Sequence, residues 1–147
     1  MKRTLEDLPI DEEFACGSFT LSEAEIIEFA SRYDPQPWHL SEEQARDTYF
    51  ESLCASGLHS QGAAINLMVR ATTDVDVVAG GSMHEARFFV PVRPGQSYSV
   101  SAVWTQARPS STNPTRGVAS IKITAADAAG VTVMTCGVTF IVGRRPA

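Results

Sequence analysis

A chain of 147 residues that is 44% hydrophobic can bury a substantial core, and we expect a single domain over residues 1–147 with its core at about 12–142. The formal net charge of −5, with no run of basic residues beyond Arg144 and Arg145, argues against nonspecific nucleic-acid binding, because the molecule would repel a polyanion. No apolar stretch approaches the roughly 20 residues that span a bilayer, and no secretory signal begins the chain, so we expect a cytoplasmic protein without a membrane segment.

The charge is distributed unevenly along the chain. Residues 1–51 contain thirteen acidic and four basic residues, a balance of −9, whereas residues 52–147 contain four acidic and eight basic residues, a balance of +4. An anionic small molecule could therefore bind the second half. The three cysteines, Cys16, Cys54 and Cys136, show neither CxxC nor Cys/His ligand spacing, so we expect reduced thiols and no metal site.

The first regular elements are an extended segment at 13–20 and a helix at 23–33. Ser22 and Glu25 form a capping box at the start of this helix, and Leu21 and Ile26 form a hydrophobic staple. Pro35 stops the helix directly after Asp34.

A proline-rich segment then places an acid and an imidazole five residues apart, at Asp34 and His39. Pro35 and Pro37 fix their own φ angles and restrict the residues before them, so we expect a rigid, non-helical loop. Such a loop can hold a carboxylate and an imidazole toward one pocket at little entropic cost.

A second capping box, Ser41 with Gln44, predicts a short helix at about 42–49. After the turn at Gly57, the proline-free stretch from Leu58 to about Thr72 predicts a long helix. Its small residues on one side and aliphatic residues all round indicate burial on most faces, as in a central helix wrapped by a sheet.

From residue 82 onward the hydrophobic period changes to two. Strands joined by short turns should pair as antiparallel neighbours. Because the strands follow the helices along the chain, we expect an α+β fold in which a curled antiparallel sheet wraps around the long helix. The four expected strands cover residues 84–90, 97–106, 117–126 and 131–142.

These residues resemble the hot-dog fold and, within it, the MaoC-like dehydratases and (R)-specific enoyl-CoA hydratases. The family pattern Asp-x-Asn-Pro-x-His corresponds to the segment from Asp34 to His39, with Gln36 in place of the asparagine. The His-Gly pair that opens the family's central helix corresponds to Ser56 and Gly57. ARFFVPVRPGQSYSV resembles the family's strand, Pro-Gly turn and strand.

The resemblance implies reversible hydration of a 2-enoyl-CoA thioester, with coenzyme A as part of the substrate and no separate cofactor. Asp34 and His39 would hold the attacking water, and the backbone N–H of Gly57, at a helix N-terminus, would bind the thioester oxygen. It also implies a homodimer joined at the sheet edges, or a dimer of dimers. The remaining substrate-binding candidates are Gln36, Trp38, Ser56 and Ser60.

Each candidate also fits a structural role. Asp34 could cap the turn after its helix, and His39 could be a half-buried imidazole with a structural partner. Trp38 could wall an acyl pocket or hold the loop, and Ser60 could line a tunnel or satisfy a backbone group. The other histidines are expected on a helix face, His59, and at the exposed head of a strand, His84.

Two other functions remain open on the same fold: a binding module that has lost the reaction through Gln36 and Ser56, and an acyl-CoA thioesterase. No GxSxG elbow and no phosphate-binding glycine motif is present, which disfavours a serine hydrolase and a nucleotide-dependent enzyme. The phosphates of coenzyme A are expected to approach the basic half, where the candidate ligands are Arg87, Arg93, Arg108 and Arg116.

Overall fold

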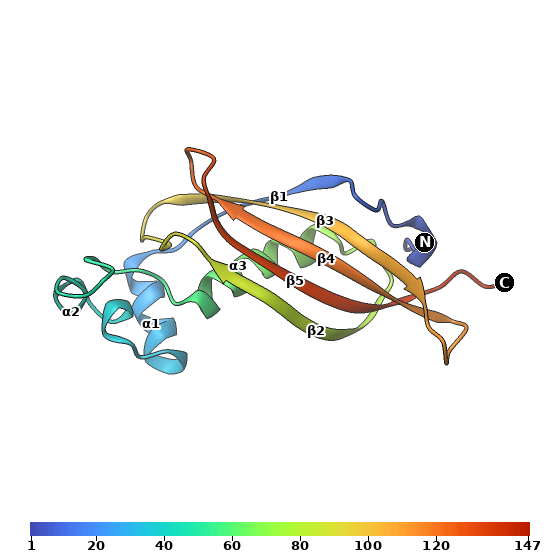
Figure 1. Ribbon diagram of the computed structural model, residues 1–147, viewed down its shortest axis with the longest axis horizontal. Coiled ribbons are helices and arrows are strands. Elements are labelled where there is room, and N and C mark those ends of the chain that lie inside the picture. The colour runs from blue at the N-terminus through green and yellow to red at the C-terminus, as the bar shows by residue number, and fades with distance from the viewer.

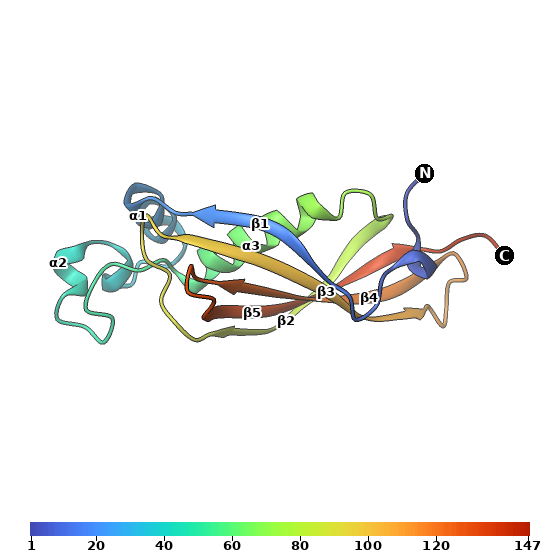
Figure 2. The same ribbon diagram turned by 90° about the horizontal axis from the view of Figure 1, so that it is seen from above.

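The computed structural model describes residues 1–147 as one curled antiparallel sheet with a long helix, α3 (Gly57–Ala71), against one of its faces. Figures 1 and 2 show α3 lying along the sheet, with the smaller helices gathered at one end. This arrangement confirms the predicted α+β hot-dog architecture. The strands run in the order β1-β3-β4-β5-β2, and their bounds are β1 Glu13–Thr20, β2 Val77–Phe88, β3 Ser97–Pro109, β4 Arg116–Ala126 and β5 Thr132–Gly143.

The helices before α3 form largely as expected. α1 (Glu23–Tyr33) begins with the predicted capping box, in which the Glu25 N–H donates to Ser22 Oγ at 3.1 Å and the Ser22 N–H donates to the Glu25 carboxylate at 3.2 Å. α2 (Glu42–Ala45) is shorter than predicted. The Thr48 hydroxyl donates to the Ala45 carbonyl at 2.7 Å, and this local bond competes with continuation of the helix.

The core lies between α3 and the inner face of the sheet. The predicted alternation in β3 is correct, because Tyr98, Val100, Ala102 and Trp104 are all at most 2% exposed. The prediction for α3 is wrong for a single chain: the only buried residues of the helix are Ser60, Ala64 and Met68, one stripe at a spacing of four that faces the sheet.

β2 begins at Val77, seven residues before the predicted start, so His84 lies inside the strand and not at its head. Gly80 and Gly81 interrupt the β-branched pattern there, and three register shifts against β5 disguise the period of two. β2 pairs only with β5, so its other edge is free in a single chain.

The chain ends pack against each other, contrary to the expectation that the core begins near residue 12. Leu5 and Leu8 are buried in the main core. The Arg144 guanidinium lies 3.1 Å from the Glu6 carboxylate, and Arg145 pairs with Asp7. Both termini lie at the end of the molecule opposite α1 and α2 (Figure 1).

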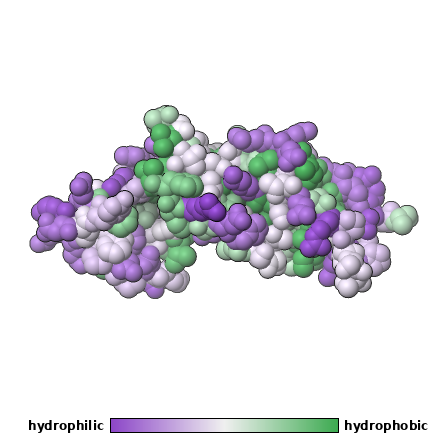
Figure 3. Space-filling view, viewed as in Figure 1, coloured by the Kyte–Doolittle hydropathy of each residue, from purple (hydrophilic) through white to green (hydrophobic).

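The outer face of the sheet mixes hydrophilic and hydrophobic residues, and hydrophilic residues gather around α1 and α2 (Figure 3). This end carries much of the acidic excess of residues 1–51. None of the helices has the length and apolar character needed to cross a membrane.

Candidate active site

Asp34 and His39 come together where α1 ends. The Asp34 N–H donates to the Ala30 carbonyl at 2.9 Å and ends the helix, and the chain then turns so that His39 Nε2 lies 3.5 Å from Asp34 Oδ2. The turn is not the fully non-helical loop that was predicted, because residues Pro37–His39 form one turn of 3-10 helix. Proline at the first position of a helical turn already has the required φ, so Pro37 favours this turn.

The ring orientation of His39 is fixed by a backbone carbonyl. Nδ1 lies 2.6 Å from the Cys54 oxygen, so Nδ1 carries the proton and donates it to that carbonyl. In the neutral imidazole, Nε2 is then an acceptor, and it faces Asp34. His39 is 6% exposed, so this orientation is held inside the protein.

Ser56 holds the Asp34 carboxylate from the other side. Its hydroxyl donates to Asp34 Oδ2 at 2.7 Å and accepts the Leu58 N–H at 3.2 Å, which also caps α3. Ser56 is fully buried and does not line the cavity described below. It was predicted as a substrate-binding residue, and the structure places its hydroxyl on the Asp34 carboxylate, which it can orient. Asp34 Oδ1 has no hydrogen bond.

Gly57 supplies an unoccupied donor next to this pair. It is the first residue of the 15-residue helix α3, and its backbone N–H makes no hydrogen bond. Helix N-termini attract negative charge, so this N–H fits a developing oxyanion. A methyl group on Gly57 would lie only 2.8–3.0 Å from atoms of the Phe88 ring, so the close approach of that ring requires glycine.

A cavity of about 650 Å³ opens beside these groups and is mostly apolar. Asp34, His39 and Gly57 all line it, as do Trp38 and Ser60. The position of Trp38 is compatible with both of its predicted roles, because it lines the cavity and its ring also packs against Phe50, with centroids 5.3 Å apart. The Ser60 hydroxyl likewise lines the cavity and donates to the Ser56 carbonyl at 3.3 Å.

Gln36 is not part of the cavity. Its side chain is exposed and makes no hydrogen bond, so the structure does not support its predicted role in substrate binding. Several apolar lining residues were missed by the sequence prediction, because they come from the loop after α2, the end of β2 with the residue after it, and the start of β5, and they meet only in the folded chain. They include Tyr49, Phe88, Phe89, Val133 and Met134.

Burial also shifts the pKa values of two further groups near the cavity. Burial raises the pKa of the Cys54 thiol to about 11, so this thiol stays protonated near neutral pH although it lines the cavity. Burial lowers the pKa of His59, whose ring stacks on Phe29 with centroids 4.4 Å apart. His59 is therefore a helix-face residue, as predicted. No group of three or more His, Cys, Asp or Glu side chains is arranged to hold a metal ion.

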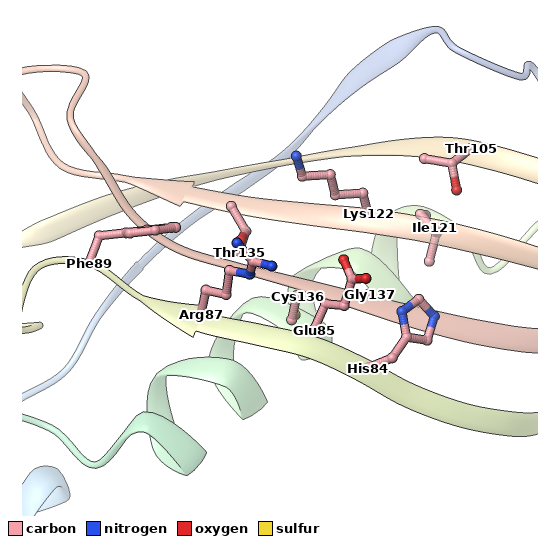
Figure 4. Close-up of a pocket in the computed structure, with 10 residues that line it drawn as sticks. All are labelled: His84, Glu85, Arg87, Phe89, Thr105, Ile121, Lys122, Thr135, Cys136 and Gly137. Atoms are coloured by element: carbon pink, nitrogen blue, oxygen red, sulfur yellow. The ribbon is translucent and has the colours of Figure 1, made fainter.

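A second hollow, of about 400 Å³, lies on the sheet and contains none of the predicted catalytic residues (Figure 4). His84 lies beside it, as an exposed side chain whose Nε2 is 3.0 Å from Thr139 Oγ1, so its predicted surface position is correct. The hollow also includes Arg87 and Lys122, and neither of these has an ion-pair partner.

The four candidate arginines for phosphate binding do not form one group. Arg108 and Arg116 flank the β3–β4 turn, at the end of the molecule with the termini (Figure 1). The Arg93 guanidinium is bound to backbone carbonyls. Only Arg87 is both unpaired and near the cavity end of β2.

Comparison with known proteins gives consistent relatives. The family model described as the MaoC like domain matches residues 7–127. The crystal structure of a MaoC-like dehydratase from Rhodospirillum rubrum is 30% identical, with a TM-score of 0.88 and 99% coverage of each chain. An (R)-hydratase from A. caviae involved in PHA biosynthesis shares the fold at 19% identity, with a TM-score of 0.74 over 92% of this chain and 97% of that one.

The uncharacterized protein YdeM of Bacillus subtilis (strain 168) is 31% identical over 91 residues. This alignment spans 61% of the present chain and 64% of YdeM, which is just under two thirds of that relative's length. The family match, by contrast, covers most of the present chain and includes Asp34, His39 and Gly57. The chain therefore belongs to the MaoC-like dehydratase family.

Proposed function

We propose that this protein catalyses the reversible addition of water to a 2-enoyl-CoA thioester, giving a (3R)-3-hydroxyacyl-CoA. The observation that carries the proposal is the meeting of Asp34, His39 Nε2 and the free Gly57 N–H around one apolar cavity. An apolar cavity suits an acyl chain, and the three polar groups that line it can bind the reacting end of a thioester.

The proposed reaction uses the two side chains to handle protons. A water bound between Asp34 Oδ1 and His39 Nε2 loses a proton to this pair while its oxygen bonds to Cβ of the enoyl group. The electron pair of the double bond moves toward the thioester, and Cα then receives a proton from the same pair. The water oxygen and the proton for Cα both come from the side of the double bond that faces this pair, so the addition is syn. One water and one enoyl thioester give one 3-hydroxyacyl thioester.

The Gly57 N–H is proposed to stabilise the intermediate. Negative charge develops on the thioester oxygen as Cβ is attacked, and the N–H at the start of α3 is a fixed donor for that oxygen. Ser56 keeps the carboxylate of Asp34 in place during this step, because its hydroxyl donates to Oδ2 at 2.7 Å.

Incubation with crotonyl-CoA, with enoyl absorbance and free thiol followed together, tests the proposal. We expect absorbance to fall without release of thiol. Thiol release would instead indicate a thioesterase, and binding of several acyl-CoA chain lengths without either change would indicate a binding protein. Either result would overturn the proposed hydratase activity.

We also propose that two copies of the chain associate through β2. This strand pairs on one side only, and its exposed apolar residues include Val78 at 45%, Met83 at 67% and Phe88 at 51%. Ala86, Phe88 and Phe89 line the cavity from this edge, so a partner here would complete the cavity wall. Light scattering at micromolar concentration should give a dimer or a dimer of dimers, and a monomer would contradict the proposal.

A further inference from the structure

Arg93 binds the backbone of the segment that supports the catalytic pair. It lies in the turn between β2 and β3, and its guanidinium donates to the carbonyls of Phe50 at 2.8 Å, Ser52 at 2.6 Å and Leu53 at 3.3 Å. No carboxylate lies within ion-pair distance of Arg93. The side chain therefore serves as a donor to carbonyls and not as half of a salt bridge.

The segment that Arg93 binds has little support of its own. The stretch 50–56, which runs between α2 and α3, is neither helix nor strand, so few of its carbonyls have partners in regular structure. Among its backbone N–H groups, those of Glu51 and Ser52 donate to the nearby Thr48 and Phe50 oxygens, at 3.1 Å and 2.7 Å. Those of Cys54 and Ala55 donate to the Trp38 and Val92 oxygens, at 3.0 Å and 2.9 Å. The guanidinium supplies donors at several points of one irregular turn, which its planar fork allows and a lysine ammonium does not.

The same segment holds both catalytic side chains in orientation. The Cys54 carbonyl accepts the Nδ1–H of His39, and the Ser56 hydroxyl donates to Asp34. A shift of this backbone would change the tautomer of His39 and the position of the Asp34 carboxylate together. Displacement of about 1 Å at such a pair can cost on the order of 10²-fold in rate.

Arg93 is itself held in place by a residue of the sheet. Its backbone N–H donates to the hydroxyl of Tyr98 at 2.8 Å, and Tyr98 is 1% exposed in β3, with its ring stacked on Phe19. The rigid sheet is thereby connected to the irregular segment through one side chain.

We propose that Arg93 is a positioning residue that fixes His39 in its Nδ1–H tautomer by clamping the carbonyls of residues 50–53. This inference rests on the proposed hydratase function for its kinetic consequence, but its structural consequence is independent of any activity. Arg93 is thus removed from the set of phosphate ligands considered from the sequence.

Two variants test the clamp. Arg93→Lys keeps the charge and loses the fork, whereas Arg93→Met keeps much of the side-chain volume and loses every donor. Arg46→Met is the matched control, because Arg46 is exposed directly after α2 and its side chain makes no hydrogen bond or ion pair. We expect kcat to fall by about 10-fold to 10²-fold in both Arg93 variants, with KM nearly unchanged, and no change in the control.

The second readout is the ¹⁵N spectrum of the imidazole of His39, assigned with His39→Gln. We expect the Nδ1–H tautomer in the wild type and a shift toward the other tautomer in Arg93→Lys. A folded Arg93→Lys protein with wild-type kcat and wild-type ¹⁵N signals would overturn the proposal, and so would a rise in KM at constant kcat, which would make Arg93 a substrate ligand. If the wild type lacks hydratase activity, the proposed function fails, and the ¹⁵N comparison still decides the clamp.

Discussion

The two ends of the molecule hold their polar groups in different ways. At the α1 end, hydrogen bonds from uncharged groups orient the side chains: the Ser56 hydroxyl donates to Asp34 and His39 donates to the Cys54 carbonyl, without any lysine or arginine paired to the carboxylate. At the other end, the termini are held by exposed ion pairs such as Arg144 with Glu6.

This difference between the two ends predicts where a substitution will reduce catalysis and where it will reduce only stability. Exposed ion pairs contribute little because water and salt screen them, typically about 0.2–1 kcal/mol each. A half-buried carboxylate oriented by one hydroxyl has few alternative partners when that hydroxyl is lost. We therefore expect changes at the α1 end to affect catalysis strongly, and changes at the termini to affect only stability, and weakly.

Removing the base at the α1 end should have the largest effect. Asp34→Asn keeps the shape of the side chain but cannot accept a proton, so kcat should fall by about 10²-fold to 10⁴-fold with the melting temperature nearly unchanged. His39→Ala should likewise nearly abolish hydration. Asp47→Asn, at an exposed aspartate whose side chain makes no hydrogen bond or ion pair, is the control. Full activity in Asp34→Asn or His39→Ala would remove the pair from the reaction.

Crowding the oxyanion donor should have the next largest effect. The added methyl group in Gly57→Ala would meet the Phe88 ring at 2.8–3.0 Å, and we expect kcat to fall by about 10-fold to 10²-fold as the ring or the helix start moves. The double variant with Phe88→Leu should recover part of the loss. Gly62→Ala on the same helix meets no atom within 4 Å and should keep full kcat, so an equal loss there would show a general helix effect.

Loss of the carboxylate's hydroxyl partner should be milder. Ser56→Ala removes a hydrogen bond to a charged group, which is worth about 1.5–3 kcal/mol, and we expect at least a tenfold loss in kcat. It also removes a helix cap. Ser22→Ala removes the cap of α1 without touching the site. Measuring the free energy of unfolding and kcat of both variants therefore separates the capping role of Ser56 from its role in orienting Asp34. Equal kcat in the two variants would show that Ser56 acts only as a cap.

The ion pairs at the termini should give the smallest effect. The Arg145 backbone N–H, followed by the Glu6 N–H and then the Arg144 side chain, lowers the pKa of Glu6 from 4.5 to about 2. Because the pKa of Glu6 is lower in the folded than in the unfolded state, ionised Glu6 stabilises the fold above about pH 4.5. This stabilisation is lost as the pH falls toward 2.

The Glu6 side chain is 33% exposed, so we expect Glu6→Gln to cost under about 1 kcal/mol at pH 7. Urea unfolding at pH 7 and at pH 3 gives the free energy of unfolding of the wild type and of the variant. The difference between these two free energies should be smaller at pH 3. A difference that grows on acidification would contradict the assignment.

The elements that could be predicted from the sequence are those marked by a strong pattern among neighbouring residues. The capping box at Ser22 located α1, and the alternation around Trp104 located β3, because each is decided within a few neighbouring residues. The start of β2 at Val77 was missed, since its glycines and bulges hide the period. The packing of Leu5 into the core was missed because it depends on contacts with distant strands.

The site divides in the same way. The acid and imidazole were identified from a short motif between prolines, but the roles of their supports depend on contacts across the chain. Ser56 lies 22 residues from the carboxylate that it orients, and the Cys54 carbonyl 15 residues from the imidazole that it binds. Gln36, within the motif in sequence, is exposed and does not line the cavity, because sequence spacing alone does not fix side-chain direction at the residue before a 3-10 turn.

The central claim is that one pair of side chains, on one side of the substrate, adds water to a 2-enoyl thioester. Hydration of crotonyl-CoA in D₂O, with the configuration of the product at C2 and C3 determined by NMR, tests it most directly. We expect deuterium and hydroxyl on the same face, with the (R) configuration at C3, and no product from Asp34→Asn. Anti addition, a racemic product or free thiol in place of the hydroxyacyl thioester would contradict the claim.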